Sequence, residues 1–137
     1  NLSNANLSNV NLTRADLSNA DLRDADLTRA DLRFADLRFA NLTDTTLTGA
    51  NLSDANLINA DLTGADLSGY DLTNVNLSGA ILTSSDLSGT NLSGANLSGA
   101  DLSGAFLKGA DLSGADLTNI EYDNETIWPE SFEPPVS

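Results

Sequence analysis

Leucine recurs at every fifth residue from Leu2 to Leu117, with no insertion or deletion between the units. We denote this leucine position i. In the 24 units the residue at i−2 is mostly alanine, the residue at i−1 is Asn or Asp in 21, and the residue at i+1 is Ser or Thr in 19. A period of five matches neither the turn of an α-helix nor the two-residue alternation of a strand. Repetition at a fixed period instead indicates a solenoid, in which each unit packs chiefly against its neighbours.

Each unit predicts a short extended triplet followed by a turn. In a triplet such as Ala15-Asp16-Leu17, two apolar residues flank a polar one, so that both apolar side chains point to the same side. The two residues after each leucine are rich in Gly, Asn, Ser and Thr, which favour turns over long helices. The repeat therefore predicts a coil with flat sides and regular corners, with Leu and Ala inside it.

The repeated pattern resembles the pentapeptide repeat family, whose consensus is A(D/N)LXX, over about 120 of the 137 residues. This resemblance implies an all-β fold, a right-handed quadrilateral β-helix with four units in each coil. For 24 units it implies about six coils of four pentapeptides, followed by a C-terminal capping segment. We therefore expect a β-helix domain over residues 1–120 and a C-terminal cap and tail over residues 121–137.

The stacked coils place every twentieth residue in one column. Leucine columns are expected to be the main source of stability, because burying a leucine contributes roughly 1.5–3 kcal/mol. The i−2 columns hold small residues, and Tyr70 breaks that rule between Ala50 and Thr90. A tyrosine ring does not fit in the space of an alanine, so we predict a local bulge, or an outward-pointing ring, at Tyr70.

The polar i−1 columns alternate Asn and Asp in places, as in Asn11, Asp31, Asn51 and Asp71. Like charges stacked at β spacing are destabilising, so this alternation separates the carboxylates. Rows of carboxylates can also hold calcium, which makes a metal site the alternative. The calcium-binding nonapeptide with its paired glycines is missing from the sequence, and we predict no metal and no cofactor.

The corner residues differ between the two halves of the chain. All ten glycines fall at i+2, from Gly49 to Gly114. Gly and Asn tolerate the positive φ that the third residue of a type II turn requires. Between Arg14 and Asp44 most i+2 positions hold other residues. We therefore expect type II corners mainly in the second half and different corners in the first two or three coils.

The same early region holds the one concentrated surface signal. All five arginines lie within 25 residues of a chain with net charge −14. Two phenylalanines occupy corners that should face solvent, and Arg14 would lie one coil from Phe34, within reach of a cation–π contact. Exposed aromatics beside arginine are typical of interface anchors, whereas the alternative is simple pairing with Asp16, Asp24 and Asp36. The candidate partner patch comprises Arg14, Arg23, Arg29, Arg33, Phe34, Arg38 and Phe39.

The repeat stops after Ile120, and the tail carries the only tryptophan and all three prolines. Because an open solenoid end exposes apolar side chains and unpaired backbone, we expect the tail to fold over the last coil. Its Tyr-Asp, Thr-x-Trp-Pro and Phe elements resemble the endings of pentapeptide repeat proteins from cyanobacteria and plants. The first coil has no such cover, so we expect an end-to-end homodimer through it. The predicted capping residues are Tyr122, Ile127, Trp128 and Phe132.

Composition argues against catalysis. The chain has no histidine and no cysteine, so Ser–His and Cys–His nucleophile pairs are impossible. Its carboxylates are expected on convex, solvated faces, where little raises a pKa for acid–base work. Strong acidity disfavours direct binding to nucleic acid or anionic membrane, and no apolar run approaches the ~20 residues of a bilayer span. We predict that the protein is not an enzyme and does not insert into a membrane.

Two non-catalytic functions remain. We expect a structural or protein–protein interaction scaffold, whose partner the sequence does not identify. The family resemblance implies an alternative, because some pentapeptide repeat proteins bind DNA gyrase as an acidic rod that imitates duplex DNA. The arginines of the early coils and the lack of a loop between repeats argue against that alternative. The column of threonines Thr43, Thr63 and Thr83 suggests ice binding as a third, less favoured function, but Arg23 interrupts this column.

Only the family resemblance indicates the cellular compartment of the protein. Similarity to cyanobacterial and plant proteins implies a soluble protein of the periplasm or thylakoid lumen, after loss of a targeting segment. The cytoplasm is the alternative, and the lack of cysteine suits either setting.

Overall fold

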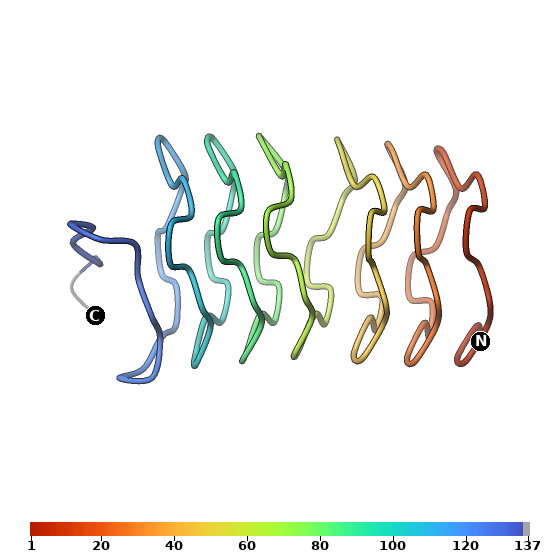
Figure 1. Cartoon of the computed structure of the whole chain (residues 1–137), viewed down its shortest axis with the longest axis horizontal. Coiled ribbons are helices and arrows are strands. Elements are labelled where there is room, and N and C mark those ends of the chain that lie inside the picture. The colour runs from red at the N-terminus through yellow and green to blue at the C-terminus, as the bar shows by residue number, and fades with distance from the viewer. Residues whose placement is uncertain (136–137) are drawn as a thin grey trace.

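The computed structural model describes residues 1–135 of the chain. Within this range there is no helix and no strand longer than one bridged residue, and the repeated element is an isolated parallel β-bridge between i−1 residues. Most bridges join residues 20 positions apart, from Asn6 with Asp26 to Asp101 with Glu121. Four pentapeptides therefore make one coil, and the coils stack along a single axis (Figure 1). In the same residues no helix has the length and apolar character needed to cross a membrane.

Leucine side chains fill the interior of the rod. From Leu22 to Leu107, no leucine at position i is more than 2% exposed, and most alanines at i−2 are buried beside them. The prediction that both positions point inward is confirmed. Burial is weaker in the first coil, where Leu2, Leu7 and Leu12 are only partly buried.

Three backbone hydrogen bonds per unit join neighbouring coils. The leucine amide donates to the i−1 carbonyl of the next coil, as from Leu12 to Asp31 at 2.8 Å, and the i−1 amide donates back, as from Asp31 to Val10 at 3.0 Å. The i+2 amide makes the third bond, as from Arg14 to Arg33 at 2.9 Å. Each such bond adds only about 0.5–1.5 kcal/mol net, so the stack is stable through their number.

Two kinds of local hydrogen bond close the corners. The amide at the next i−2 position donates to the leucine carbonyl, as from Ala15 to Leu12 at 2.9 Å. The Asn or Asp side chain at i−1 accepts the amide of residue i+1, as Asn11 accepts from Thr13 at 2.9 Å. Short polar side chains that bind their own backbone two residues ahead stabilise turns, which explains why Asn and Asp dominate the i−1 columns.

The prediction of different corners in the first coils is wrong. At every corner of the repeat, residue i+2 has a positive φ between 54° and 75°. Arg29, Phe34 and Phe39 adopt this conformation with φ of 56°, 60° and 58°. The conformation occurs both where the i+2 amide bonds the next coil, as at Phe34, and where it does not, as at Asp44 and Gly114, so the tight corner itself requires it. Left-handed backbone costs a non-glycine residue roughly 1–2 kcal/mol, which burial and stacking offset.

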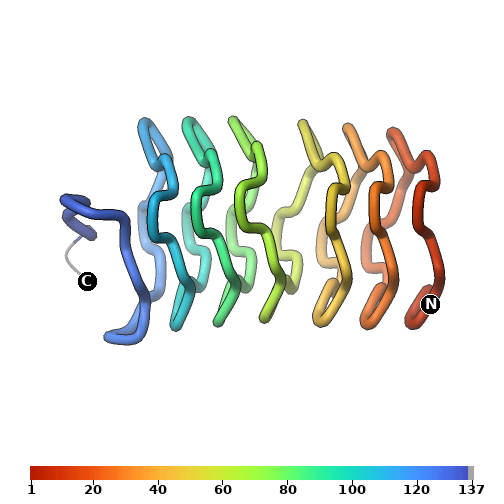
Figure 2. The backbone as a smooth tube through the Cα atoms, in the orientation of Figure 1, coloured from red at the N-terminus to blue at the C-terminus, as the bar shows by residue number. Residues whose placement is uncertain are grey.

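The stack opens at one level, between the coil of residues 41–60 and the coil of residues 61–80. Two sides of the quadrilateral keep their bridges there, whereas the two sides that meet at Tyr70 have no bridge within the described chain. The wider spacing is visible in the backbone trace (Figure 2). The Tyr70 ring is partly buried and packs against the core. The predicted local bulge is therefore confirmed, with the ring turned inward rather than outward.

The coil continues beyond the end of the sequence repeat. Glu121 bridges to Asp101, and Ile127 bridges to Phe106 across 21 positions because the intervening corner contains one extra residue. Ile127 thus occupies an outward i−1 position and is 44% exposed. Its prediction as a residue that folds over the last coil is wrong, since the shifted register places it on a flat side.

Candidate interaction surfaces

The seven residues of the predicted patch encircle the rod rather than forming one surface. With four units in a coil, Arg33 and Phe34 share one corner, and Arg38 and Phe39 share the next. The other two corners of that coil carry Arg23 and Arg29, so these two arginines lie apart from the rest. The structure brings five of the seven together at neighbouring corners, and we call this group the aromatic corners: Arg14, Arg33, Phe34, Arg38 and Phe39.

Three arginines bind the aspartate two residues before them. Arg33 donates from Nε to Oδ1 of Asp31 at 2.8 Å and from Nη2 to Oδ2 at 2.6 Å. Positions i−1 and i+1 point outward on the same side, so each pair forms within one unit. The same bidentate geometry joins Arg23 with Asp21 and Arg38 with Asp36.

Of the three aspartates predicted as partners, only Asp36 binds an arginine side chain among the described residues. Asp16 instead accepts the hydroxyl and amide of Ser18, at 2.6 and 3.1 Å. The geometry favours pairing between residues two positions apart within one unit. The repeated Asp-Leu-Arg triplet was the signal that would have found Asp21 and Asp31.

The arginine pairs depress the pKa of their aspartates. The hydrogen bond from Arg33 lowers the pKa of Asp31 to about 2, and Arg23 likewise lowers the pKa of Asp21 to about 2. The pKa of Asp36 is also lowered, first by the hydrogen bond from Arg38. All three carboxylates are therefore ionised at neutral pH. Each pair is locally neutral, and its net contribution to stability is small because water screens it.

The two phenylalanine rings of the aromatic corners face solvent, as predicted. Phe34 is 50% exposed and Phe39 is 55% exposed. The guanidinium carbon of Arg14 lies 5.5 Å from the ring centroid of Phe34, which confirms the predicted cation–π contact. The corners thus present two exposed rings beside arginines that are already held in place.

Three tail aromatics gather on the last coil. The rings of Tyr122 and Trp128 meet edge to face with centroids 5.4 Å apart, and those of Trp128 and Phe132 stack at 5.3 Å. All three pack against the leucine core. The Tyr122 hydroxyl donates to the carbonyl of Pro135 at 2.6 Å, which ties the end of the described chain to the coil. Three of the four predicted capping residues therefore lie together.

A second apolar surface lies near the C-terminal end. Phe106 is 50% exposed and bridges to Ile127, so two apolar side chains neighbour each other at outward i−1 positions. Ile127 was predicted as a capping residue instead, whereas Phe106 was not among the predicted site residues. Its signal in the sequence is an apolar residue where the repeat demands Asn or Asp.

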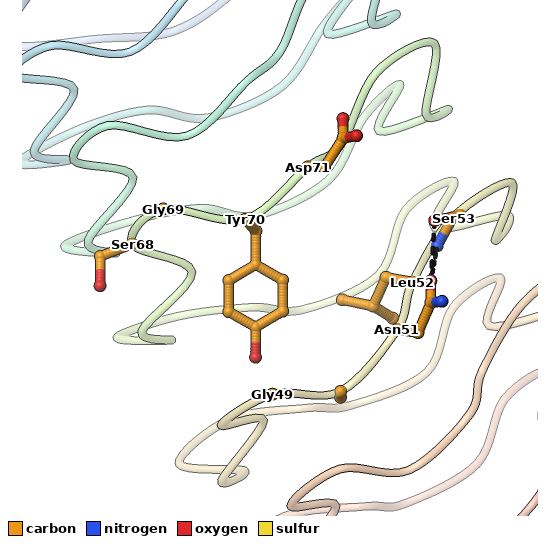
Figure 3. Close-up of a pocket in the computed structure, with 9 residues that line it drawn as sticks. Gly49, Asn51, Leu52, Ser53, Ser68, Gly69, Tyr70 and Asp71 are labelled. Atoms are coloured by element: carbon orange, nitrogen blue, oxygen red, sulfur yellow. Dashed lines mark hydrogen bonds between the residues drawn. The ribbon is translucent and has the colours of Figure 1, made fainter.

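A slit opens where the stack is interrupted (Figure 3). It has a volume of ≈ 510 Å³ and is lined by residues 49–53 of one coil and residues 68–71 of the next. The Tyr70 ring points across the gap toward the preceding coil, and its hydroxyl donates to the carbonyl of Leu47. Burial raises the pKa of Tyr70, so the phenol remains a donor at neutral pH.

The acidic side chains of the slit and the flat sides are poor candidates for acid–base chemistry. Hydrogen bonds from Ser68 and Thr73 lower the pKa of Asp66 and Asp71 respectively. A carboxyl group with a lowered pKa has no proton to give at neutral pH. Within residues 1–135, no three acidic side chains form a group suited to hold a metal ion.

The comparison with protein families gives a match along most of the chain. The model described as pentapeptide repeats matches in eight copies, over residues 1–38, 30–69, 40–79, 50–89 and 80–119. A comparison with curated proteins gave no match.

Solved structures give a similar result. A trypsin-treated form of QnrB1, a plasmid-mediated fluoroquinolone resistance protein, is 25% identical, with a TM-score of 0.59 over 88% of this chain and 65% of that chain. A pentapeptide repeat protein from the Arabidopsis thaliana thylakoid lumen is 25% identical, with a TM-score of 0.52 over 92% of this chain and 72% of that chain. HetL, a pentapeptide repeat protein involved in heterocyst differentiation regulation in the cyanobacterium Nostoc, is 38% identical, with a TM-score of 0.47 over 87% of this chain and 68% of that chain.

These relatives are longer than the chain, which spans 65% of the QnrB1 form and 72% of the Arabidopsis protein. Pentapeptide repeat structures imply a right-handed quadrilateral β-helix, which agrees with the 20-residue bridge spacing. Proteins of this kind are generally structural or interaction proteins. The matched repeats cover residues 1–119, and the chain therefore belongs to the pentapeptide repeat family.

Proposed function

We propose that the chain is a non-catalytic scaffold for protein–protein interaction, built as a rod of about six coils with the aromatic corners as its partner surface. The observation that carries this proposal is the exposure of Phe34 and Phe39 beside arginines that Asp31 and Asp36 hold in place. Aromatic and arginine side chains supply most binding energy at protein interfaces. Elsewhere the flat sides mostly present short polar side chains, which suit a spacer more than an anchor.

The geometry of the aromatic corners supports tight binding for a further reason. Each phenylalanine sits on a corner whose backbone is fixed by stacking, and the arginine just before it in the sequence is hydrogen-bonded to an aspartate. A surface that is ordered before binding loses less conformational entropy when the partner arrives. The corners therefore resemble a preformed anchor site rather than a flexible tail.

The two ends of the rod extend the proposal. Tyr122, Trp128 and Phe132 cap the last coil, since they pack on its core. At the other end, a second copy stacked on the first coil would complete the burial of Leu2 and Leu7, which are partly exposed. Light scattering should then show that the dimeric fraction increases with protein concentration. A monomer at high concentration would argue against end-to-end association. The Arabidopsis thylakoid lumen relative supports a lumenal or periplasmic location as part of this proposal.

A pull-down with variants tests the partner surface. The intact chain is compared with a triple variant, Arg33→Ala, Phe34→Ala and Phe39→Ala, and with Phe106→Ala as a matched control. Phe106 is as exposed as Phe34 but lies four coils further along the stack, near its C-terminal end. We expect the triple variant to lose a partner that the intact chain and the control both retain. Equal recovery of that partner by all three proteins would remove the aromatic corners from the proposal.

A DNA-mimicking rod that binds DNA gyrase is the second candidate. The net charge of −14 and the structural similarity to QnrB1, a fluoroquinolone resistance protein, favour it. A gyrase supercoiling assay with and without a quinolone separates the two functions. Inhibition, or protection from the quinolone, at micromolar protein would support mimicry, whereas neither effect at that concentration would dismiss it.

A further inference from the structure

The slit at Tyr70 exposes a row of backbone donors. In closed parts of the stack the leucine amides donate to the following coil, as Leu87 and Leu92 do at 2.7 and 2.8 Å. At the slit, the amides of Leu47, Gly49 and Leu52 have no backbone hydrogen-bond acceptor among the described residues, and the Gly49 amide lies beside the Tyr70 hydroxyl. Gly49 and Leu52 line the opening, and Leu47 comes just before them on the same coil.

The opposite wall carries the matching acceptors. In a closed stack the i−1 carbonyl accepts the leucine amide of the preceding coil, as Asp86 accepts from Leu67 at 2.8 Å. The carbonyls of Asp66, Ser68 and Asp71 accept no hydrogen bond within residues 1–135. The amides of Asp66 and Asp71 likewise donate no backbone hydrogen bond within residues 1–135, so each wall of this interrupted parallel ladder carries both donors and acceptors.

Tyr70 explains why the ladder stays open. One coil later in the same column, the Thr90 hydroxyl donates to the carbonyl of Leu67 at 2.7 Å, and that stack is closed. Tyr70 makes the equivalent bond to Leu47, but a whole ring lies between its backbone and its hydroxyl. The ring occupies the space that a threonine or alanine leaves free, so the two coils are held apart.

The walls define the chemistry of a ligand. Unpaired backbone N–H and C=O groups require partners, and an extended peptide offers donors and acceptors in matching rows. Among the described residues, Asp71 is the only charged one that lines the opening, and hydrogen bonds from Thr73 lower its pKa, so it is ionised at neutral pH. A volume of ≈ 510 Å³ lies within the ~300–1,000 Å³ of ordinary ligand sites, which suits a few residues of extended chain.

We propose that this slit binds a short, basic, extended peptide segment of a partner protein, whose main chain completes the interrupted ladder. Main-chain hydrogen bonds supply affinity, and Asp71 selects positive over negative side chains. The site is separate from the aromatic corners and does not depend on them. If the slit binds no peptide, the proposed function of the aromatic corners is therefore unaffected, and the reverse also holds.

Two capped tetrapeptides of matched shape are suitable probes: acetyl-Lys-Val-Thr-Lys-amide and acetyl-Glu-Val-Thr-Glu-amide. The measurement is the shift of backbone amide signals in two-dimensional NMR as each peptide is added to the intact chain. We expect the basic peptide to cause saturable shifts at Leu47, Gly49 and Leu52, with little change at Leu87 and Leu92. The acidic peptide should bind at least ten-fold more weakly.

Two further probes separate main-chain pairing from other binding. A basic peptide with methylated main-chain nitrogens retains its charge but cannot donate, and we expect it to lose binding. N-methylacetamide tests whether any small amide fills the slit, and no saturable shift is expected. The proposal is overturned if the methylated peptide binds equally well, if the small amide produces the same shifts, or if the shifts spread over all acidic sides of the rod.

Variants of Tyr70 complete the test. In Tyr70→Thr the side chain should bond to Leu47 as Thr90 bonds to Leu67, so the slit closes and peptide binding falls at least ten-fold. Tyr70→Phe keeps the ring and should retain binding. Thermal unfolding of both variants checks that they fold, and Tyr70→Ala serves in place of the threonine variant if that protein does not. Undiminished binding by a folded variant with a closed slit would overturn the proposal.

Discussion

Two neighbouring levels of the rod show what the small residue at i−2 controls. Between the coils of residues 61–80 and 81–100, bridges form on all four sides, and Ser85, Thr90 and Ala95 stand at i−2. One level earlier, Tyr70 leans back to the carbonyl of Leu47, and two sides are open. Leucine burial hardly differs between the two levels. The leucine repeat thus sets the shape of the coil, whereas the i−2 residue decides whether one coil bonds to the next.

Truncation of a leucine should produce the largest effect. Leu92→Ala, in a closed stack, is expected to lower the free energy of unfolding by about 2–5 kcal/mol, because the site collapses poorly. Leu52 is also buried but lines the slit, where neighbours can shift and water can enter, so Leu52→Ala should lose less. Urea unfolding followed by circular dichroism measures both. A larger loss for Leu52→Ala would contradict the difference drawn between the two levels.

A tyrosine placed in a closed stack should reproduce the slit. Ala95→Tyr is expected to lower the free energy of unfolding by about 1–3 kcal/mol, since overpacking forces the coils apart. Ala95→Thr is the matched control, because Thr90 shows that a threonine fits this kind of position when its hydroxyl finds a leucine carbonyl. Equal stability of the two variants would mean that the ring at Tyr70 is not what opens the stack.

The corners offer a smaller test of how closely coils approach. A methyl group at Gly94 would lie 2.3 Å from Oδ1 of Asn74, whereas one at Gly99 would meet nothing within 4 Å, and both residues have a φ of 68°. Left-handed strain of about 1 kcal/mol or more is therefore common to Gly94→Ala and Gly99→Ala. Gly94→Ala should lose slightly more in urea unfolding, and adding Asn74→Ala should remove the difference. Identical losses would show that the Asn74 side chain simply moves aside.

The smallest expected effect concerns charge. It compares two aspartates of the same i−1 column, Asp31 near one end of the rod and Asp111 near the other. Asp31 is paired with Arg33 and has a pKa of about 2, whereas Asp111 has its pKa lowered by Ser113 alone. Because the folded pKa of Asp31 lies below its unfolded value near 3.9, the stability from this pair is present above about pH 4 and is lost as pH falls through about 2. In Arg33→Gln, the pKa of Asp31 should rise while that of Asp111 stays unchanged.

A carboxyl NMR titration of both proteins measures these pKa values directly. Thermal unfolding adds a second reading, since the difference between the intact chain and Arg33→Gln should shrink from pH 4 to pH 2. An unchanged pKa of Asp31 in the variant would show that the guanidinium is not its cause.

The features that the sequence predicts are those that depend on spacing and size. Inward leucines follow from the period of five, and the contact between Arg14 and Phe34 follows from their separation of 20 residues. The opening at Tyr70 follows from the volume of its ring in a column of small residues. Each of these needs only the register of the coil.

The features that the sequence does not predict depend on backbone geometry and register. Phe34 has a left-handed backbone because its corner requires a positive φ, although its residue type disfavours that conformation. Ile127 faces outward because one extra residue shifts the register of the tail. The polar walls of the slit depend on the direction in which Tyr70 leans, and residue type alone does not specify that direction.

Hydrogen exchange of the intact chain tests the central contrast most directly. Amides that are bonded within the stack open only with it, whereas unbonded amides exchange freely. We predict that Leu47, Gly49 and Leu52 exchange at least ~100-fold faster than Leu87, Gly89 and Leu92, their equivalents two coils later. Equal protection of the two sets would mean that the ladder is continuous at Tyr70, and the account of the i−2 residue would be wrong.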